Sequence, residues 1–149
     1  PDGDAAARER GMGEPMTVTH WPSAAVSVLA LLVYCWIVFR TGQARGRYKI
    51  AAPAVTGHPG FERAYRVQQN TVEQIVLFLP ALWLCALTLG DPWAALVGLV
   101  WPIGRILYAR AYAADPDKRG PGFLLTLLPS IVLLLGAAVG TVRLALVAL

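Results

Sequence analysis

Four polar side chains with helical spacing lead into an apolar segment of this sequence. Arg63, Arg66, Asn70 and Glu73 follow one another at intervals of three, four and three residues, and the apolar segment Gln74–Leu89 comes directly after them. Residues three and four apart share one face of an α-helix, so these side chains form one stripe. Ionisable groups at membrane depth cost several kcal/mol each and persist where they face a protein or water-filled interior. The stripe therefore indicates a polar site at the headgroup level of a membrane protein.

A second polar stripe follows later in the chain. Arg105, Tyr108 and Tyr112 repeat the interval of three and then four residues, and Arg119 lies beyond them in a connection rich in glycine and proline. Both stripes approach basic connections, so we expect them to lie near the same face of the membrane and to converge. Two helices would then offer arginines, tyrosines, one amide and one carboxylate to a common site.

The set contains more arginines than carboxylates, which indicates that it binds an anionic partner. A guanidinium binds a carboxylate through two parallel hydrogen bonds. A small peptide with two carboxylates, an amine and amide groups suits the whole set, because arginines would hold the carboxylates, Glu73 the ammonium and Asn70 the amides. Glutathione is such a molecule, and a lipid headgroup is the alternative that the residues leave open. Residue by residue, snorkelling arginines and helix–helix hydrogen bonds are structural alternatives.

The elements that must position these residues are membrane helices. The chain of 149 residues is 56% hydrophobic and only 15% charged. About 20 residues suffice to span the hydrocarbon core, and the second apolar stretch is long enough only if its polar lead-in from Phe61 is helical too. We predict an all-α integral membrane protein with one four-transmembrane-helix bundle. The four apolar stretches are Trp21–Phe39, Gln74–Leu89, Pro92–Tyr112 and Phe123–Val147.

Breaks between the helices are predicted at Thr56–Gly60, Gly90–Pro92 and Arg119–Gly122, with Pro129 inside the last helix. Basic residues crowd the first and third connections, whereas the second carries only Asp91. The positive-inside rule then places the first and third connections in the cytoplasm and both termini outside it. The net charge of +4 is explained mostly by basic residues that set the membrane orientation or belong to the polar site, and not by a nucleic-acid-binding face. The basic residues concerned are Arg40, Arg45, Arg47, Lys49 and Arg63, and then Arg110, Lys118 and Arg119.

The remaining features have structural interpretations. Residues 1–15 are polar and mixed in charge, which predicts a disordered or foreign tail before a single domain over residues 16–149. Cys35 and Cys85 are isolated in apolar segments and are expected to be buried, inert packing residues. His20 and His58 lack ligand spacing, so no metal site is expected.

The run from Phe61 to Glu73 resembles the MAPEG superfamily, the membrane-associated proteins of eicosanoid and glutathione metabolism. The superfamily pattern is similar to F-E-R-x-x-R-x-Q-x-N-x-x-E followed by an apolar run, which this chain matches through Glu73 and continues with Phe78–Trp83. The basic run Ala44–Lys49 and the run Arg105–Tyr112 are similar to the leukotriene-C synthase and microsomal glutathione transferase branch. The resemblance covers most of the chain after Trp21.

The resemblance implies a homotrimer in a membrane, for a bacterial member the inner membrane, with glutathione bound between neighbouring protomers. It implies a glutathione transferase acting on lipophilic electrophiles from the bilayer, with lipid-hydroperoxide reduction as a companion activity. A non-catalytic lipid-binding or scaffolding subunit and a glutathione-dependent isomerase are the alternatives. Arg119 is similar to an arginine that stabilises the thiolate. The residues that look like glutathione contacts, with Arg105 as a supporting arginine, are Arg45, Arg66, Gln68, Asn70, Glu73, Arg105, Tyr108 and Tyr112.

Two departures from the branch pattern restrict what the resemblance implies. Gln74 stands where the eicosanoid enzyme carries a tyrosine, which removes one glutathione contact. Gly46 stands where that branch has a second consecutive arginine. The identity of the lipid substrate therefore does not follow, and eicosanoid synthesis is not implied.

Overall fold

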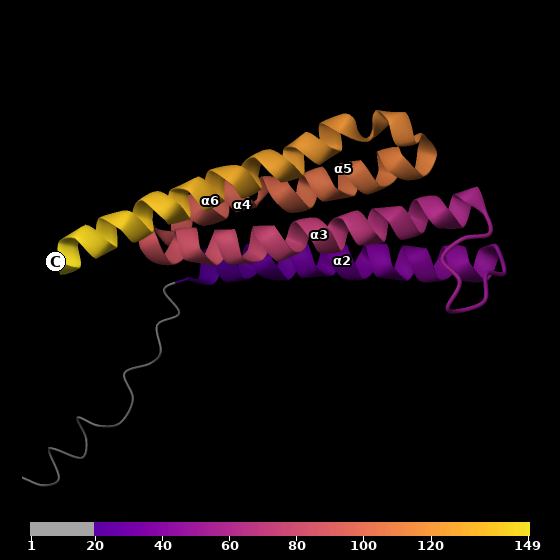
Figure 1. Ribbon diagram of the computed structural model, residues 1–149, viewed down its shortest axis with the longest axis horizontal. Coiled ribbons are helices and arrows are strands. Elements are labelled where there is room, and N and C mark those ends of the chain that lie inside the picture. Colours follow the sequence, from indigo (N-terminus) through magenta and orange to yellow (C-terminus); the bar gives the residue numbers. More distant parts are fainter. Residues whose placement is uncertain (1–19) are drawn as a thin grey trace, which may run out of the picture.

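The computed structural model describes residues 20–149, which form a bundle of long helices with no strand among them (Figure 1). The predicted all-α architecture is confirmed. Residues 1–15, predicted to be a polar tail, lie outside the described residues. The helices are α2 (Trp21–Arg47), α3 (Pro59–Thr88), α4 (Asp91–Gly98), α5 (Val100–Ala114) and α6 (Gly120–Ala148), with the short 3-10 helix η1 (Pro116–Arg119) before α6.

The polar lead-in of the second apolar stretch is helical, as spanning requires. α3 runs without interruption for 30 residues, and Pro80 lies inside it. Its start is well defined, because Pro59 occupies the first turn and the His58 Nδ1 accepts a hydrogen bond from the backbone N–H of Gly60 at 3.0 Å. Proline is favoured in the first turn, where its missing N–H would be unpaired anyway. The polar stripe is therefore carried by the same helix that crosses the core.

The third apolar stretch, predicted as one helix, is two. α4 ends at Gly98 and α5 begins at Val100, with Leu99 between them. Pro102 explains the break, because it lacks the N–H that would bond the Gly98 carbonyl and its ring crowds that carbonyl. The backbone of Leu99 itself is helical, at φ −62° and ψ −23°, so α4 and α5 together make one membrane-length segment, and α5 carries the second polar stripe.

Three other expectations about the elements were wrong. α2 continues to Arg47, so Arg40, Arg45 and Arg47 belong to a helix and not to the first connection. Arginine, glutamine and alanine are good helix formers, and the long arginines reach polar surroundings from a helical backbone. α6 begins at Gly120, so the break before it is shorter than predicted. Cys85 is buried as expected, but Cys35 is exposed on the outer face of α2.

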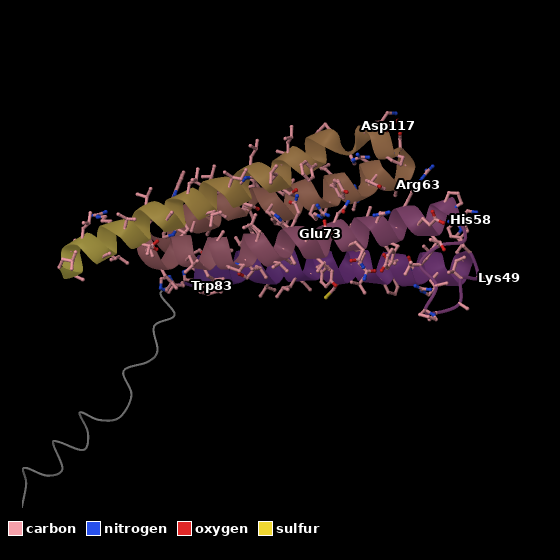
Figure 2. The ribbon with its side chains drawn as sticks, viewed as in Figure 1. Lys49, His58, Arg63, Glu73, Trp83 and Asp117 are labelled. Atoms are coloured by element: carbon pink, nitrogen blue, oxygen red, sulfur yellow. The ribbon has the colours of Figure 1, made fainter. Side chains whose placement is uncertain are left out.

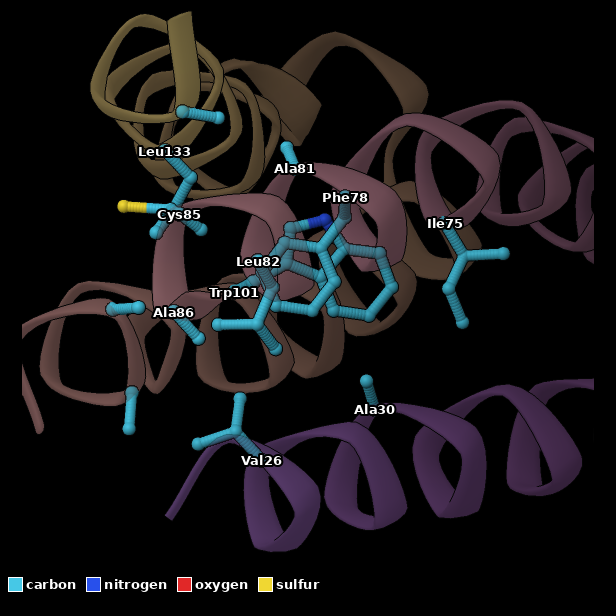
Figure 3. Packing of buried hydrophobic residues seen from close by; sticks show 13 residues of the cluster. Val26, Ala30, Ile75, Phe78, Ala81, Leu82, Cys85, Ala86, Trp101 and Leu133 are labelled. Carbon is cyan, nitrogen blue, oxygen red and sulfur yellow. The ribbon is translucent and has the colours of Figure 1, made fainter. Parts of the chain in front are cut away.

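The apolar core lies where α2, α3, α4 and α6 meet the start of α5. Val26 of α2 packs with Leu82 of α3 and Leu133 of α6 in one buried cluster (Figure 3). Phe78 and Trp101 stack at its centre, with ring centroids 4.7 Å apart and planes at 10°. Between membrane helices close packing, rather than the hydrophobic effect, drives association. This core fixes α3 against the α4–α5 pair.

The outer faces of the helices are apolar. Large side chains such as Leu32, Val76 and Leu135 are exposed in the protomer. The chain has four helical segments long and apolar enough to cross a membrane: Trp21–Arg47, Pro59–Thr88, Asp91–Ala114 and Pro116–Ala148. The predicted four-span bundle is confirmed in this respect.

Candidate functional site

The two polar stripes meet through a hydrogen bond between α3 and α5. The Asn70 side-chain amide Nδ2 donates to the Tyr108 hydroxyl. Tyr108 is almost fully buried, at 1% exposure, and Asn70 is half-buried. The contact therefore stands at the rim of the bundle, with the tyrosine inside and the amide partly open.

Arg105 lies behind Tyr108 and supports it. Its guanidinium carbon is 4.1 Å from the centroid of the Tyr108 ring, and the whole residue is buried at 0% exposure. The Arg105 Nε donates to the Thr71 hydroxyl at 2.9 Å, and Nη2 donates to the Val67 carbonyl at 3.4 Å. The Thr71 hydroxyl in turn donates to the Val67 carbonyl at 2.6 Å. A cation in this position holds the ring by its face and also ties α5 to α3.

Arg119 reaches the same stripe from η1. Its guanidinium carbon is 5.6 Å from the centroid of the Tyr112 ring, and the Tyr112 and Tyr108 rings are 5.6 Å apart. Arg119 Nη1 donates to the Pro116 carbonyl at 3.1 Å, while the residue itself is exposed. The structure thus lines up Arg119, Tyr112, Tyr108 and Asn70 from the connection inward.

Two glycines let α5 and α6 approach closely beside this row of polar side chains. A Cβ on Gly122 would overlap the backbone of Tyr108, and a Cβ on Gly104 would lie 2.8 Å from the backbone carbon of Leu125. Atoms this close cannot coexist with a side chain, so both positions require glycine. Small residues serve the same purpose at many membrane helix contacts.

Arg66 and Glu73, predicted on the α3 stripe, are both exposed in the protomer. Figure 2 shows Glu73 near the middle of the bundle and Arg63 closer to the end where Lys49 and His58 lie. No ion pair or hydrogen bond within residues 20–149 engages Arg66 or Glu73. These exposed charges lie on α3 within four residues of Asn70, on either side of it.

The other predicted residues lie elsewhere. The Arg45 guanidinium is stacked 4.6 Å from the centroid of the Phe61 ring and donates to the Ala54 carbonyl at 2.8 Å, so it organises the loop after α2. Gln68 is half-buried on α3. Arg63, expected on the stripe, lines a separate cavity with residues of α2 and α5. Within one protomer these three residues do not join the Asn70–Tyr108 contact.

Thr71 is a functional candidate that the sequence reasoning missed. It is buried at 0% exposure and accepts the shortest hydrogen bond of Arg105. The signal was present, because Val67, Thr71 and Ile75 recur every four residues and mark the inward face of α3. A threonine on an otherwise apolar inward face asks for a hydrogen-bond partner inside the bundle.

Four membrane-length segments around a buried Arg–Tyr–Asn contact define a multi-pass integral membrane protein with a polar site between its helices. The chain belongs to the MAPEG family, whose model matches residues 23–139. The matched region includes every residue of the two stripes and Arg119. The resemblance drawn from the spacing of the polar residues is therefore confirmed.

Three relatives illustrate where the chain stands in the family. An uncharacterized protein of Synechocystis is 46% identical over 82% of this chain and 90% of its own length. Human microsomal glutathione S-transferase 2 is 41% identical over 76% of this chain and 78% of its own length. Bovine leukotriene C4 synthase is 35% identical over 64% of each chain.

Proposed function

We propose that this protein is a membrane-bound glutathione transferase that conjugates glutathione to lipophilic electrophiles. The observation that carries the proposal is the arrangement around the Asn70–Tyr108 contact, where a buried polar core is flanked by the exposed charges of Arg66, Glu73 and Arg119. Relatives named as a glutathione transferase and a leukotriene C4 synthase support a glutathione-dependent transfer reaction.

The charges match the charges of glutathione. Arg66 would hold a carboxylate, Glu73 the α-ammonium group, and Asn70 a peptide amide. Charge-assisted hydrogen bonds of this kind are about twice as strong as neutral ones. Tyr108 is fixed from behind by Arg105 and would present its hydroxyl toward the ligand. The buried Arg105 thus positions a contact without touching glutathione itself.

Arg119 would favour the thiolate of glutathione. A free thiol has a pKa of about 8.5 and is mostly protonated at neutral pH, and a nearby guanidinium lowers that value. The thiolate sulfur attacks the electrophilic carbon, a carbon–sulfur bond forms, and the bond to the leaving group breaks with its electron pair. With a hydroperoxide, the sulfur attacks the terminal oxygen and releases the alcohol. A second glutathione then converts the resulting sulfenic acid to the disulfide and water.

A homotrimer is part of the proposal. Arg45 and Gln68, which the family resemblance assigns to glutathione, do not reach the Asn70–Tyr108 contact within the protomer. A neighbouring copy would bring them to that contact and cover the exposed charges of Arg66 and Glu73. Mass measurement in detergent should give a trimer, and a stable monomer that still binds glutathione would exclude this assembly.

The membrane and orientation are proposed from charge. The end of the bundle with the loop 48–58 and the helix η1 carries most of the arginines among residues 20–149, which favours the cytoplasmic side of a bacterial inner membrane. Both termini would then lie outside the cytoplasm. A reporter enzyme that works only outside the cytoplasm should be active when it is fused at Leu149. If instead only a reporter that works in the cytoplasm is active there, the orientation is the reverse.

The decisive experiment is a conjugation assay on the purified protein with a panel of lipophilic electrophiles. Thiolate absorbance on adding glutathione is measured in parallel. Conjugation together with thiolate formation supports the transferase. Glutathione binding without any turnover would favour the non-catalytic alternative, and isomerised substrate without conjugate would favour the isomerase.

A further inference from the structure

Four arginines converge on a cavity away from the Asn70–Tyr108 contact. The cavity has a volume of about 500 Å³, within the roughly 300–1,000 Å³ of typical ligand pockets. It lies between α2, α3 and α5 at the end of the bundle where Figure 2 labels Arg63 and Lys49. Its arginines are Arg40, Arg47, Arg63 and Arg110.

No acidic residue lines this cavity. Within residues 20–149 none of its four arginines forms an ion pair. Arg40 lies 5.7 Å from the centroid of the Trp36 ring, and Arg63 makes one long hydrogen bond of 3.5 Å to the Ala114 carbonyl. Four clustered guanidinium groups repel one another. A bound anion would reduce this electrostatic repulsion, which no carboxylate lining the cavity offsets.

An apolar groove continues from the cavity along the bundle. It has a volume of about 350 Å³, and the two hollows share Trp36 and Arg110. Leu29, Leu32 and Val33 of α2 line it on one side and Ile106 of α5 on the other. The groove runs toward the middle of the helix bundle, whereas the arginine cavity lies at its end.

The same face of α2 carries both hollows. Going along the helix, the lining residues change from leucine and valine through Trp36 to Arg40 and Arg47. Tryptophan is enriched where hydrocarbon gives way to headgroups, and basic pockets between helices on the cytoplasmic side bind anionic headgroups. The order apolar, aromatic, basic is the order of an acyl chain, an ester region and a phosphate.

We propose that this cavity and groove form a binding site for one anionic phospholipid, with its phosphate among the arginines and an acyl chain along α2 and α5. The site is separate from the proposed glutathione site, because Arg110 and Ile106 lie on the face of α5 opposite Tyr108 and Tyr112. Bound lipid would bridge α2 to α5 and stabilise the bundle.

The test measures lipid retention by native mass spectrometry. The whole protein is released from bilayer discs of phosphatidylglycerol and phosphatidylcholine in equal amounts. Phosphatidylglycerol should be retained in preference. The double variant R63Q/R110Q should lose this preference, and each single variant should weaken retention roughly tenfold, since each removes a charge-assisted contact.

Lys49→Gln is the matched control, because Lys49 is a basic residue at the same end of the bundle that does not line the cavity. It should retain phosphatidylglycerol like the unchanged protein. Phosphatidylglycerol should also raise the melting temperature of the unchanged protein and of Lys49→Gln, but not of the double variant, because a ligand stabilises the state that binds it. If Lys49→Gln and R63Q/R110Q lost the preference for phosphatidylglycerol equally, the preference would come from general surface charge, and the proposed site would be wrong.

A second pair of variants tests the groove. Leu29 lines the groove and is 44% exposed, while Leu31 does not line it and is 46% exposed, so tryptophan at either position should be tolerated. Leu29→Trp should lower retention and Leu31→Trp should not. Glycerol phosphate, which lacks the chain, should not displace the lipid.

Three results would contradict the proposal. Equal retention of phosphatidylcholine would remove the role of the arginines. Displacement of the lipid by glutathione would show that the two sites overlap. A trimer that holds no lipid and shields Ala113→Cys from thiol reagents would show that a second copy of the chain fills the cavity.

Discussion

Each end of the helix bundle carries charge, but within residues 20–149 only the end where α2 begins holds a buried carboxylate. At the end where α2 begins, Asp91 is 4% exposed and its Oδ1 accepts a hydrogen bond from the Ser23 backbone N–H at 3.2 Å. His20 Nδ1 lies 3.8 Å from the same oxygen. At the other end, Arg66 and Arg119 and the arginines of the cavity meet no carboxylate within residues 20–149.

The comparison distinguishes a charge that stabilises the fold, that of Asp91, from the arginine charges that we propose bind a ligand. A carboxylate at a helix N-terminus satisfies free N–H groups and opposes the helix dipole, so Asp91 anchors α2 to the start of α4. An arginine with no carboxylate partner contributes nothing comparable to the stability of the protomer. Substitutions at the first end should therefore change stability, and substitutions at the second should change binding or turnover.

The largest effect is expected for Arg119→Ala. Loss of a group that stabilises charge at the reacting sulfur lowers turnover by roughly 100- to 1,000-fold. Glutathione binding should change much less, because Arg119 would interact mainly with the charged sulfur. The rise of rate with pH should move upward, toward the thiol pKa of about 8.5, since the cation that lowered it is gone. Steady-state kinetics against pH, with binding measured by calorimetry, checks this.

Arg119→Lys sharpens the same prediction. Lysine keeps the charge but loses the planar fork of donors, so partial activity is expected. If Arg119→Ala leaves turnover and its pH profile unchanged, Arg119 is only a topology charge. Tyr108, held in place by Arg105, would then be left to activate the thiol.

Arg66→Ala and Glu73→Ala should mainly weaken glutathione binding. Each would remove a charge-assisted hydrogen bond worth about 1.5–3 kcal/mol, which is roughly one to two powers of ten in the dissociation constant. Both residues are exposed in the protomer, so folding should be little affected. Calorimetry with glutathione, alongside thermal unfolding, measures the two quantities. A large loss of stability with unchanged affinity would place these residues with Asp91 as parts of the fold.

The sequence predicted the helices and both polar stripes because membrane spans and polar spacing are local signals. The helix α3 was recovered together with its polar lead-in, and so was the class of fold. The break at Leu99 does not follow from the sequence pattern, because membrane helices tolerate some prolines, and only the structure shows that the helix is interrupted where Pro102 faces the Gly98 carbonyl. Proline ends a helix in one case and not in another, as Pro80 and Pro129 show.

The site was only partly predictable for a different reason. The meeting of Asn70 with Tyr108 was expected, because both stripes lie near one end of the bundle. The support of Arg105 by Thr71 depends on the rotation of α3 about its axis, and the close approach at Gly122 depends on the packing of α5 against α6. Neither is a property of one helix, so spacing along the chain does not reveal it.

Asp91→Ala tests the opposite end of the bundle. Loss of the carboxylate leaves the Ser23 N–H without its acceptor and should cost about 1–2 kcal/mol of stability. The affinity for glutathione should not change, because the proposed glutathione residues lie toward the other end. Thermal unfolding in lipid discs and calorimetry check the two halves. Asp91→Asn keeps an oxygen acceptor and should fall between, whereas an affinity loss without a stability loss would break the contrast between the two ends.

The smallest effect is expected for Lys118→Gln, the neighbour of Arg119 in η1. Lys118 Nζ lies 3.5 Å from Asp115 Oδ2, and both side chains are largely exposed, at 78% and 42%. Exposed pairs of this kind contribute at most about 1 kcal/mol and often nothing measurable, since water and salt screen them. Turnover should stay within about twofold, because Lys118 has no contact with Tyr112 such as the one Arg119 makes at 5.6 Å. Lys118→Gln and Arg119→Ala each remove one positive charge from neighbouring positions. Measuring both with the same kinetic assay therefore shows whether the position of the charge matters. If Lys118→Gln lowered turnover as much as Arg119→Ala, the thiolate would be responding to the general positive field at this end of the bundle and not to one guanidinium.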